Sequence, residues 1–168
     1  MGLEGTNCTS RVLYQRLRRE LRTNVSLRLE KTSSPDEFLV SGRGELQLAI
    51  LVETLRREEY EFQVSRPEPI TKIIDGKIHE PYELLTINIT ENYMGALTDN
   101  LSGRLGELVD LSNNGSGSVR LEYSIPTRGL IGFGSFFMRA TRGSGTKDNI
   151  FTEYRPMEGQ LRKNNNWV

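Results

Sequence analysis

The hydrophobic residues near the start of the chain recur at the spacing of a helix. Leu13, Leu17 and Leu21 stand four residues apart, which predicts an amphipathic helix that begins at Thr9 or Ser10 and ends near residue 22. Alternating apolar and polar residues then predict half-buried strands, and a leucine-rich stretch predicts a second helix. In chain order, these elements are strands at residues 25–30 and 38–40, a helix at 45–57 and a strand at 60–64.

A second set of elements follows a linker at residues 68–81, in which Asp75-Gly76 is a strong hairpin signal. Apolar residues then alternate with polar ones in several runs, and two stretches rich in aromatic residues, Leu and Met have helical spacing. The predicted order of strand, helix, strand, strand, helix, strand is the split βαβ or ferredoxin-like arrangement. The strands are expected at residues 84–90, 108–111, 119–125 and 150–154 and the helices at about 91–101 and 126–138, after a short strand at 70–74.

Together, the two sets of elements predict an α+β protein made of two tandem ferredoxin-like (βαββαβ) α/β sandwiches. The first set reads helix, strand, strand, helix, strand, so it lacks the opening strand of this order. A sheet that has lost a strand exposes apolar surface and unpaired backbone groups. We therefore expect that either residues 1–6 or a neighbouring chain covers the gap, and the second possibility predicts a dimer through the first unit.

Composition narrows the classes of function. The 168 residues carry no net charge, so any attraction to nucleic acid has to come from local basic patches. No apolar run is long enough to cross a membrane. Cys8 is the lone cysteine, and the sequence shows no signal peptide, which together predict a cytoplasmic protein.

Candidate catalytic groups are missing from the sequence. His79 and Cys8 are its single His and single Cys, which is too few for a typical transition-metal site, and His79 stands in a polar linker. The glycine-rich segments at residues 129–134 and 143–147 lack the spacing of a dinucleotide fingerprint or a phosphate-binding loop. We therefore predict no catalytic, cofactor-binding or metal-binding residue in this chain.

Arginines remain as candidates for a functional site. Arg11, Arg18 and Arg22 fall on the side of the first helix opposite its leucines. In the second unit, basic residues stand near glycines, which let a backbone come close to phosphate while Arg donates to the phosphate oxygens. This combination suits contact with an RNA backbone. Spacing alone favours an ordinary solvated surface, because most charged side chains are simply exposed.

Five motifs follow one another along the chain, at residues 16–25, 38–48, 51–67, 125–132 and 141–145. The first three resemble the third domain of the bacterial TypA/BipA translational GTPases. The other two resemble the fifth domain of that family, named by analogy with elongation factor G. The resemblance implies a domain III-like unit truncated at its N-terminus (1–67), a domain V-like unit (68–155) and the start of the family's C-terminal domain (156–168).

The resemblance implies that the parent protein binds the ribosome and acts in large-subunit assembly and in translation under stress. GTP and Mg²⁺ are expected only in an N-terminal domain that precedes this sequence, and no small-molecule substrate or membrane is expected here. The expected partners are large-subunit ribosomal RNA and ribosomal proteins. The candidate contact residues are Arg18, Arg22, Arg43, Arg128, Arg139, Arg142 and Lys147.

Three positions depart from the family pattern. Gln47 stands where the family usually has His, Gly134 where it often has Arg, and Phe136 where it has an acid. An alternative hypothesis is a stand-alone tandem ferredoxin-like regulatory module that binds a ligand or a protein. A third, an acylphosphatase-like enzyme, needs an Arg in the first strand–helix loop of the second unit, and residues 90–92 offer none.

Overall fold

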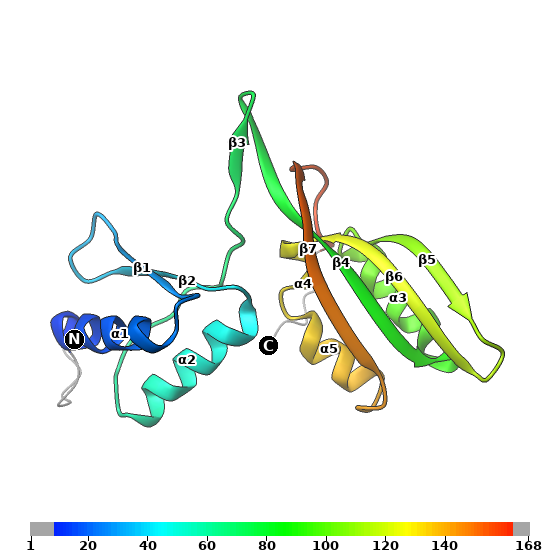
Figure 1. The fold of residues 1–168 in the computed structure, drawn as a ribbon, viewed down its shortest axis with the longest axis horizontal. Coiled ribbons are helices and arrows are strands. Elements are labelled where there is room, and N and C mark those ends of the chain that lie inside the picture. Colours follow the sequence, from blue (N-terminus) through cyan, green and yellow to red (C-terminus); the bar gives the residue numbers. More distant parts are fainter. Residues whose placement is uncertain (1–8, 163–168) are drawn as a thin grey trace. The chain divides into compact units, whose positions relative to one another are not determined.

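The computed structural model describes residues 9–162 and divides into two compact units, Met1–Pro67 and Glu68–Val168 (Figure 1). We describe each unit by itself. The last expected segment, 156–168, lies partly outside the described residues. Both units mix helices with antiparallel sheet, as predicted.

The first unit packs two helices against a two-stranded sheet. Leu17, Leu27, Leu51 and Leu55 form its buried core, so the leucine stripe of the first helix does face inward, as its spacing predicts. β1 and β2 are antiparallel, with Arg28 opposite Ser41 and Lys31 opposite Phe38. The elements are α1 (Ser10–Thr23), β1 (Arg28–Lys31), β2 (Phe38–Ser41) and α2 (Glu45–Arg57).

The expected strand at residues 60–64 was wrong, because the structure assigns no strand there. In the ferredoxin-like order the fourth strand pairs with the first, and no strand precedes α1 within residues 9–162. Tyr60 and Phe62 still pack against the leucine core. The alternating pattern therefore predicted correctly that Tyr60 and Phe62 face the core. A β-strand also needs a neighbouring strand for its backbone hydrogen bonds, and the pattern could not predict that neighbour. The dimer through this gap stays a prediction.

The start of β1 also differs from the sequence prediction. The strand was expected from residue 25, but Asn24–Ser26 is a turn in which Leu27 donates its backbone N–H to the Asn24 carbonyl at 3.2 Å. Val25 is 92% exposed at this turn. The short connection after α1 has to reverse the direction of the chain. Val25 lies in this turn and points into solvent, although the alternation of apolar and polar residues predicted that it would be half-buried in a strand.

The second unit has the predicted split βαβ order around one antiparallel sheet. Its strands lie in the order β7-β4-β6-β5, and the short β3 pairs with the start of β4. Helices α3 and α5 cover one face of this sheet in Figure 1. The elements are β3 (Lys72–Ile74), β4 (Lys77–Thr90), a 3-10 turn η1 (Glu91–Tyr93), α3 (Met94–Gly103), β5 (Glu107–Asn113), β6 (Ser118–Pro126), α4 (Thr127–Leu130), α5 (Phe133–Ala140) and β7 (Thr146–Pro156).

A single core fills the space between this sheet and its helices. Alternate residues of β4 and β6 point inward and meet Leu97 and Leu101 of α3 and Phe133 and Phe137 of α5. All of these side chains are fully or almost fully buried. The strands contribute Leu85, Ile87, Ile89, Val119, Leu121, Tyr123 and Ile125.

Two predictions for the second unit need correction. Residues 77–81 are not linker: they are the first part of β4, and both Glu80 and Pro81 are buried. The single helix expected at 126–138 is two helices, because Gly132 adopts a left-handed conformation with φ 71° between them. β7 is also longer than expected, since its pairing with β4 runs from Asn88 to His79.

Candidate nucleic-acid interface

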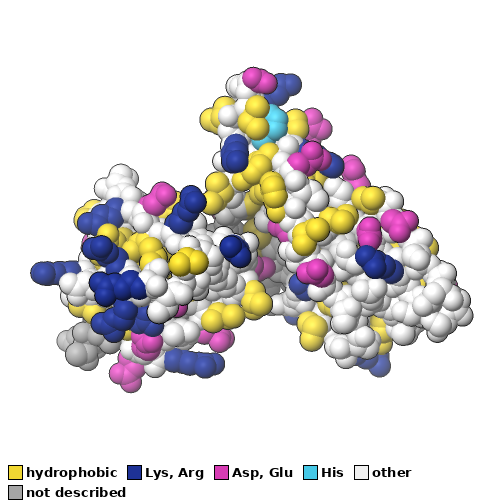
Figure 2. Space-filling model, viewed as in Figure 1, with side chains coloured by type: hydrophobic (Ala, Val, Ile, Leu, Met, Phe, Trp, Pro, Cys, Tyr) yellow, Lys and Arg dark blue, Asp and Glu magenta, His cyan; other side chains and the backbone are white. Residues whose placement is uncertain are grey.

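The predicted basic residues of the first helix are exposed on α1. Its leucines pack into the core, and this leaves Arg18 and Arg22 on the solvent side together with Arg11. Within residues 9–162 these three arginines take part in no side-chain hydrogen bond or ion pair. Figure 2 shows Lys and Arg side chains gathered over the region of α1.

Arg16 lies beside this group but has a different role. Its guanidinium contacts Glu58 at 2.6 Å and Glu20 at 3.0 Å. The hydrogen bond to Glu58 raises the pKa of Arg16 further above its already high ordinary value, against the effect of burial. The same bond lowers the pKa of the Glu58 carboxyl. Arg16 therefore ties α1 to the end of α2 and engages the two carboxylates nearest to it.

Gln47 orders the loop that carries Arg43. Its side-chain Oε1 accepts the Arg43 backbone N–H at 2.8 Å, and its Nε2 donates to Asn24 Oδ1 at 3.0 Å. The Gln47 amide also donates to the Ser26 hydroxyl. This network joins the end of α1 to the start of α2 and leaves Arg43 exposed.

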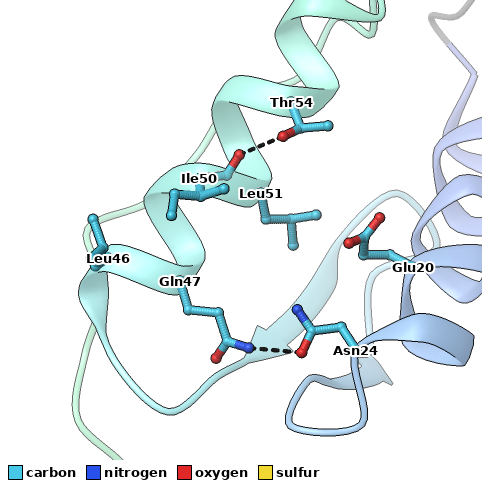
Figure 3. A pocket seen from close by; sticks show the side chains of 7 residues that line it. All are labelled: Glu20, Asn24, Leu46, Gln47, Ile50, Leu51 and Thr54. Carbon is cyan, nitrogen blue, oxygen red and sulfur yellow. Dashed lines mark hydrogen bonds between the residues drawn. The ribbon is translucent and has the colours of Figure 1, made fainter.

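A hollow of about 290 Å³ lies above this network, between α1 and α2 (Figure 3). Leu46 and Ile50 of α2 line it and are 74% and 57% exposed, while Glu20 faces it from α1. Polar groups of its lining already bond to neighbours, since Gln47 donates to Asn24 at the end of α1 and Thr54 donates to the Ile50 carbonyl at 2.8 Å. The hollow is therefore a largely apolar groove without convergent polar groups, unlike a typical small-molecule site.

Three predicted residues of the second unit lie along and just beyond α5. Arg139 is exposed in the last turn of that helix, and Arg142 follows it in a left-handed conformation with φ 51°. Lys147, at the start of β7, runs over Gly134, whose Cβ position would lie 3.6 Å from Lys147 Cε. Helix α5 thus presents a basic surface, which we call the α5 surface and define as Arg139, Arg142 and Lys147.

The loop between α5 and β7 is packed tightly against the core. A Cβ at Gly145 would lie 2.7 Å from Phe137 and 2.9 Å from Ile89, so only glycine fits there without a shift. The Thr141 hydroxyl donates to the Phe137 carbonyl at 2.8 Å and is fully buried. The loop is therefore fixed by packing, and this holds the backbone of Arg142 in place on the surface.

The remaining predicted contact, Arg128, is held inside the second unit. Its guanidinium contacts both oxygens of Glu80, at 2.6 and 3.1 Å, and the Glu80 side chain is 1% exposed. The same guanidinium donates to the backbone carbonyls of Glu158 at 2.8 Å and Gly159 at 3.2 Å. Burial, with the Glu80 carboxylate as the next cause, raises the pKa of the neighbouring Tyr82. Arg128 thus joins β4, α4 and the segment after β7.

Sequence reasoning missed both Glu80 and Arg104 as structural residues. Arg104, at the end of α3, donates from Nη1 to the carbonyls of Gly129 at 2.7 Å and Ile131 at 2.9 Å. These bonds hold the α4–α5 connection that also carries Arg128. No local signal marks the pairs, because Glu80 lies 48 residues from its partner and Arg104 lies 25 or more from the carbonyls it holds.

Two further kinds of site, a metal centre and a membrane-spanning helix, can be assessed among the residues that the structure describes. No group of three or more His, Cys, Asp or Glu side chains there could hold a metal ion. No helix among those residues is long and apolar enough to span a membrane. The exposed arginines of α1, the exposed Arg43 and the α5 surface are the candidate site.

Comparison with known proteins places the second unit in a family. The sequence model of the elongation factor G C-terminus matches residues 77–165, which is more than half of the chain. The chain therefore belongs to the elongation factor G C-terminus family. The match begins at the first residue of β4 and runs past β7, so it covers the ferredoxin-like sheet with its helices.

Several curated proteins that align with nearly the whole chain share the same name. The chain is 49% identical over 161 residues to the large ribosomal subunit assembly factor BipA of Bacillus subtilis, 48% over 167 residues to that of Synechocystis, and 51% over 158 residues to that of Haemophilus influenzae. These alignments cover 94–99% of this chain but 26–28% of the relatives. The resemblance expected from the motifs is confirmed, and the chain spans about a quarter of the relatives' length.

Proposed function

We propose that this chain is a ribosome-binding region of a translational GTPase that acts in assembly of the large ribosomal subunit. The main support for this proposal is the sequence identity of 47–51%, along nearly the whole chain, to proteins named as large ribosomal subunit assembly factors. Membership of the elongation factor G C-terminus family supports the same function. The work of such a protein would take place in the cytoplasm, where ribosomes assemble.

The proposed contacts are with large-subunit ribosomal RNA and the ribosomal proteins beside it. In the second unit they use the α5 surface, because exposed Arg and Lys side chains near glycine offer charge and close backbone approach to phosphate. In the first unit they use Arg18, Arg22 and Arg43. Arg128 is left out of the contact set, since its donors already bond to Glu80 and to two carbonyls.

Co-sedimentation with large ribosomal subunits at low and high salt tests this proposal. We expect the chain to pellet with the subunits at low salt and to be released at high salt. Binding of Arg and Lys to RNA phosphates releases counterions, and this release favours binding less as the salt concentration rises. The double variant Arg139→Gln with Arg142→Gln should bind several-fold more weakly. Its matched control is Arg120→Gln with Arg155→Gln, which removes equal charge from arginines that pair with Glu122 and Glu153. Equal binding of both variants would remove the α5 surface from the contact set.

The GTPase part of the parent's activity is proposed to reside outside this chain. No segment here has the spacing of a phosphate-binding loop, so GTP and Mg²⁺ would bind in an N-terminal domain of the parent. Calorimetric titration with GTP should therefore give no saturable heat. Saturable binding, or a thermal shift with nucleotides or amino acids, would instead favour a stand-alone regulatory module.

A further inference from the structure

We propose that Asn114 is a site of spontaneous modification, at which the side-chain amide is converted to a carboxylate. Asn114 opens the loop of residues 114–117 between β5 and β6, which we call the β5–β6 loop. The products are aspartate and isoaspartate, and isoaspartate is a substrate for enzymes that methylate isoaspartyl carboxylates. The chemistry involves this loop alone, so it does not depend on the proposed binding to the ribosome.

The reaction needs only groups of the β5–β6 loop and a water molecule. The backbone nitrogen of Gly115 attacks Cγ of Asn114, and the proton that it gives up leaves with the amide nitrogen as ammonia. The new C–N bond closes a five-membered succinimide ring. Water then opens the ring at either carbonyl. Opening at Cγ gives aspartate, and opening at the backbone carbonyl gives isoaspartate, in which the main chain runs through the former side chain.

The attacking nitrogen is unobstructed. Gly115 has no side chain, and apart from its two chain neighbours no heavy atom of residues 9–162 lies within 4 Å of its Cβ position. Asn114, Gly115 and Ser116 are all exposed, so water reaches the loop. Asn114 is also the single asparagine in the sequence that is followed by glycine. The loop therefore has the open access that ring closure and hydrolysis both require.

Hydrogen bonds hold the Asn114 amide against the backbone that follows it. Its Oδ1 accepts the Ser116 backbone N–H at 3.2 Å and the Ser116 hydroxyl at 2.6 Å. This Asx turn closes around Gly115, and its two donors draw electron density from Cγ, which makes that carbon more electrophilic. The Gly115 N–H donates to Asn113 Oδ1 at 2.9 Å, which opposes the attack. That bond is exposed, so water competes for it and its net strength is small.

Two asparagines in regular structure provide a comparison. Asn88 lies in β4, is paired with strands on both sides, and is followed by the branched Ile89. Asn100 lies within α3, and its Oδ1 accepts a hydrogen bond from Arg104 Nε at 2.7 Å. A branched side chain crowds the attacking nitrogen, and a helix or paired strand prevents the backbone from bending as ring closure requires. Both asparagines should therefore keep their amides much longer than Asn114.

Isoaspartate at position 114 would alter the hairpin as well as its charge. It adds a carbon atom to the main chain of the β5–β6 loop and places a carboxylate beside it. Asn113 and Val119 form the last pair of the β5–β6 ladder, and the Gly117 carbonyl accepts the Glu91 backbone N–H at 3.0 Å. Both interactions depend on the length of this loop. The modification should therefore loosen the end of the hairpin where the loop meets η1.

Incubation of the full chain in warm, mildly alkaline buffer tests the proposal. Samples taken over time are digested with trypsin beside an unincubated sample, and the peptides are sequenced by mass spectrometry. Residues 105–120 form one tryptic peptide, and residues 78–104, with Asn88 and Asn100, form another. We expect residue 114 to gain the mass of an NH₂-to-OH exchange several-fold faster than residues 88 and 100. Labelled methyl transfer from S-adenosylmethionine by an isoaspartyl methyltransferase should appear at the same rate.

Three variants make the test specific to the loop. Asn114→Gln should lose the mass gain and the methyl label, because glutamine would have to close a less favourable six-membered ring. Ser116→Ala should slow the reaction several-fold, since it removes the hydroxyl donor to the amide. Its matched control, Ser112→Ala on β5, should react at the parent's rate. An unchanged amide at residue 114, or equal rates at residues 88, 100 and 114, would overturn the proposal. Equal rates in the two serine variants would overturn the activation assigned to Ser116.

Discussion

At the scale of single residues, the pair of Arg128 and Glu80 joins parts of the second unit that are distant in sequence. The guanidinium bonds to a carboxylate on β4 and to two carbonyls in the segment after β7. The Glu80 side chain is 1% exposed, and the Arg128 guanidinium compensates its buried charge. The pair therefore fixes where the chain runs after β7, and it removes Arg128 from the exposed surface.

We expect Arg128→Ala to lower the free energy of unfolding of the second unit by about 3–5 kcal/mol, because it leaves a buried carboxylate unpaired. The double variant Arg128→Met with Glu80→Met should recover much of that loss, since it removes both charges. Urea unfolding followed by circular dichroism measures both. A loss below about 1 kcal/mol, as for an exposed ion pair, would contradict a structural role for Arg128.

At the scale of elements, glycines decide where the helices of the second unit can lie. A Cβ at Gly129 in α4 would lie 2.3 Å from the backbone oxygen of Arg104 at the end of α3. The two helices therefore meet backbone to backbone, and this close approach brings the Arg104 guanidinium to the carbonyls of Gly129 and Ile131. By contrast, Gly95 in α3 has no heavy atom within 4 Å of its Cβ position.

These two glycines give opposite predictions for the same substitution. Gly129→Ala should destabilise the second unit by about 1–3 kcal/mol or more, because the backbone of α3 or α4 has to move. Gly95→Ala should stabilise it by about 0.5–1 kcal/mol, because alanine loses less backbone entropy in a helix. Thermal unfolding of both variants beside the parent measures the difference. A stabilising Gly129→Ala would mean that α3 and α4 do not approach so closely.

Elements were predictable from sequence where local pattern and pairing agree. Alternation located β6 and the second half of β4, because both strands bury one face under helices and have neighbours on both edges. It failed at residues 60–64, where Tyr60 and Phe62 do pack against the core but no neighbouring strand among residues 9–162 completes the ladder. The spacing of apolar residues predicts which side chains are buried. Strand pairing depends on a second segment of the chain, so the spacing within one segment does not predict it.

At the scale of the whole molecule, the two units differ in the size of their cores. Among residues 9–162, eleven buried side chains form the core of the second unit and four form that of the first. Each fully buried aliphatic side chain contributes about 1.5–3 kcal/mol. The first unit should therefore open at a lower free energy than the second.

Hydrogen exchange read by mass spectrometry tests this ranking. Amides of α1 and α2 should exchange sooner than those of β4, β6 and α3. Leu17→Ala, in the smaller core, should accelerate exchange in residues 10–57 and leave β4 unchanged. Leu97→Ala is the matched substitution and should act on the second unit alone. Equal acceleration of both units by either variant would show that they unfold together.

The sequence by itself determined α1, α2 and α3, the inward faces of the strands, the ferredoxin-like order of the second unit and the family, because these depend on local spacing and on motifs. It also identified the basic residues as candidates for contact. Only the tertiary structure decided which of them have free donors: Arg18 and Arg22 lie on the solvent side of α1, while Arg128 is held by Glu80. The physical reason is that an ion pair forms between side chains 48 residues apart, and folding alone brings them together.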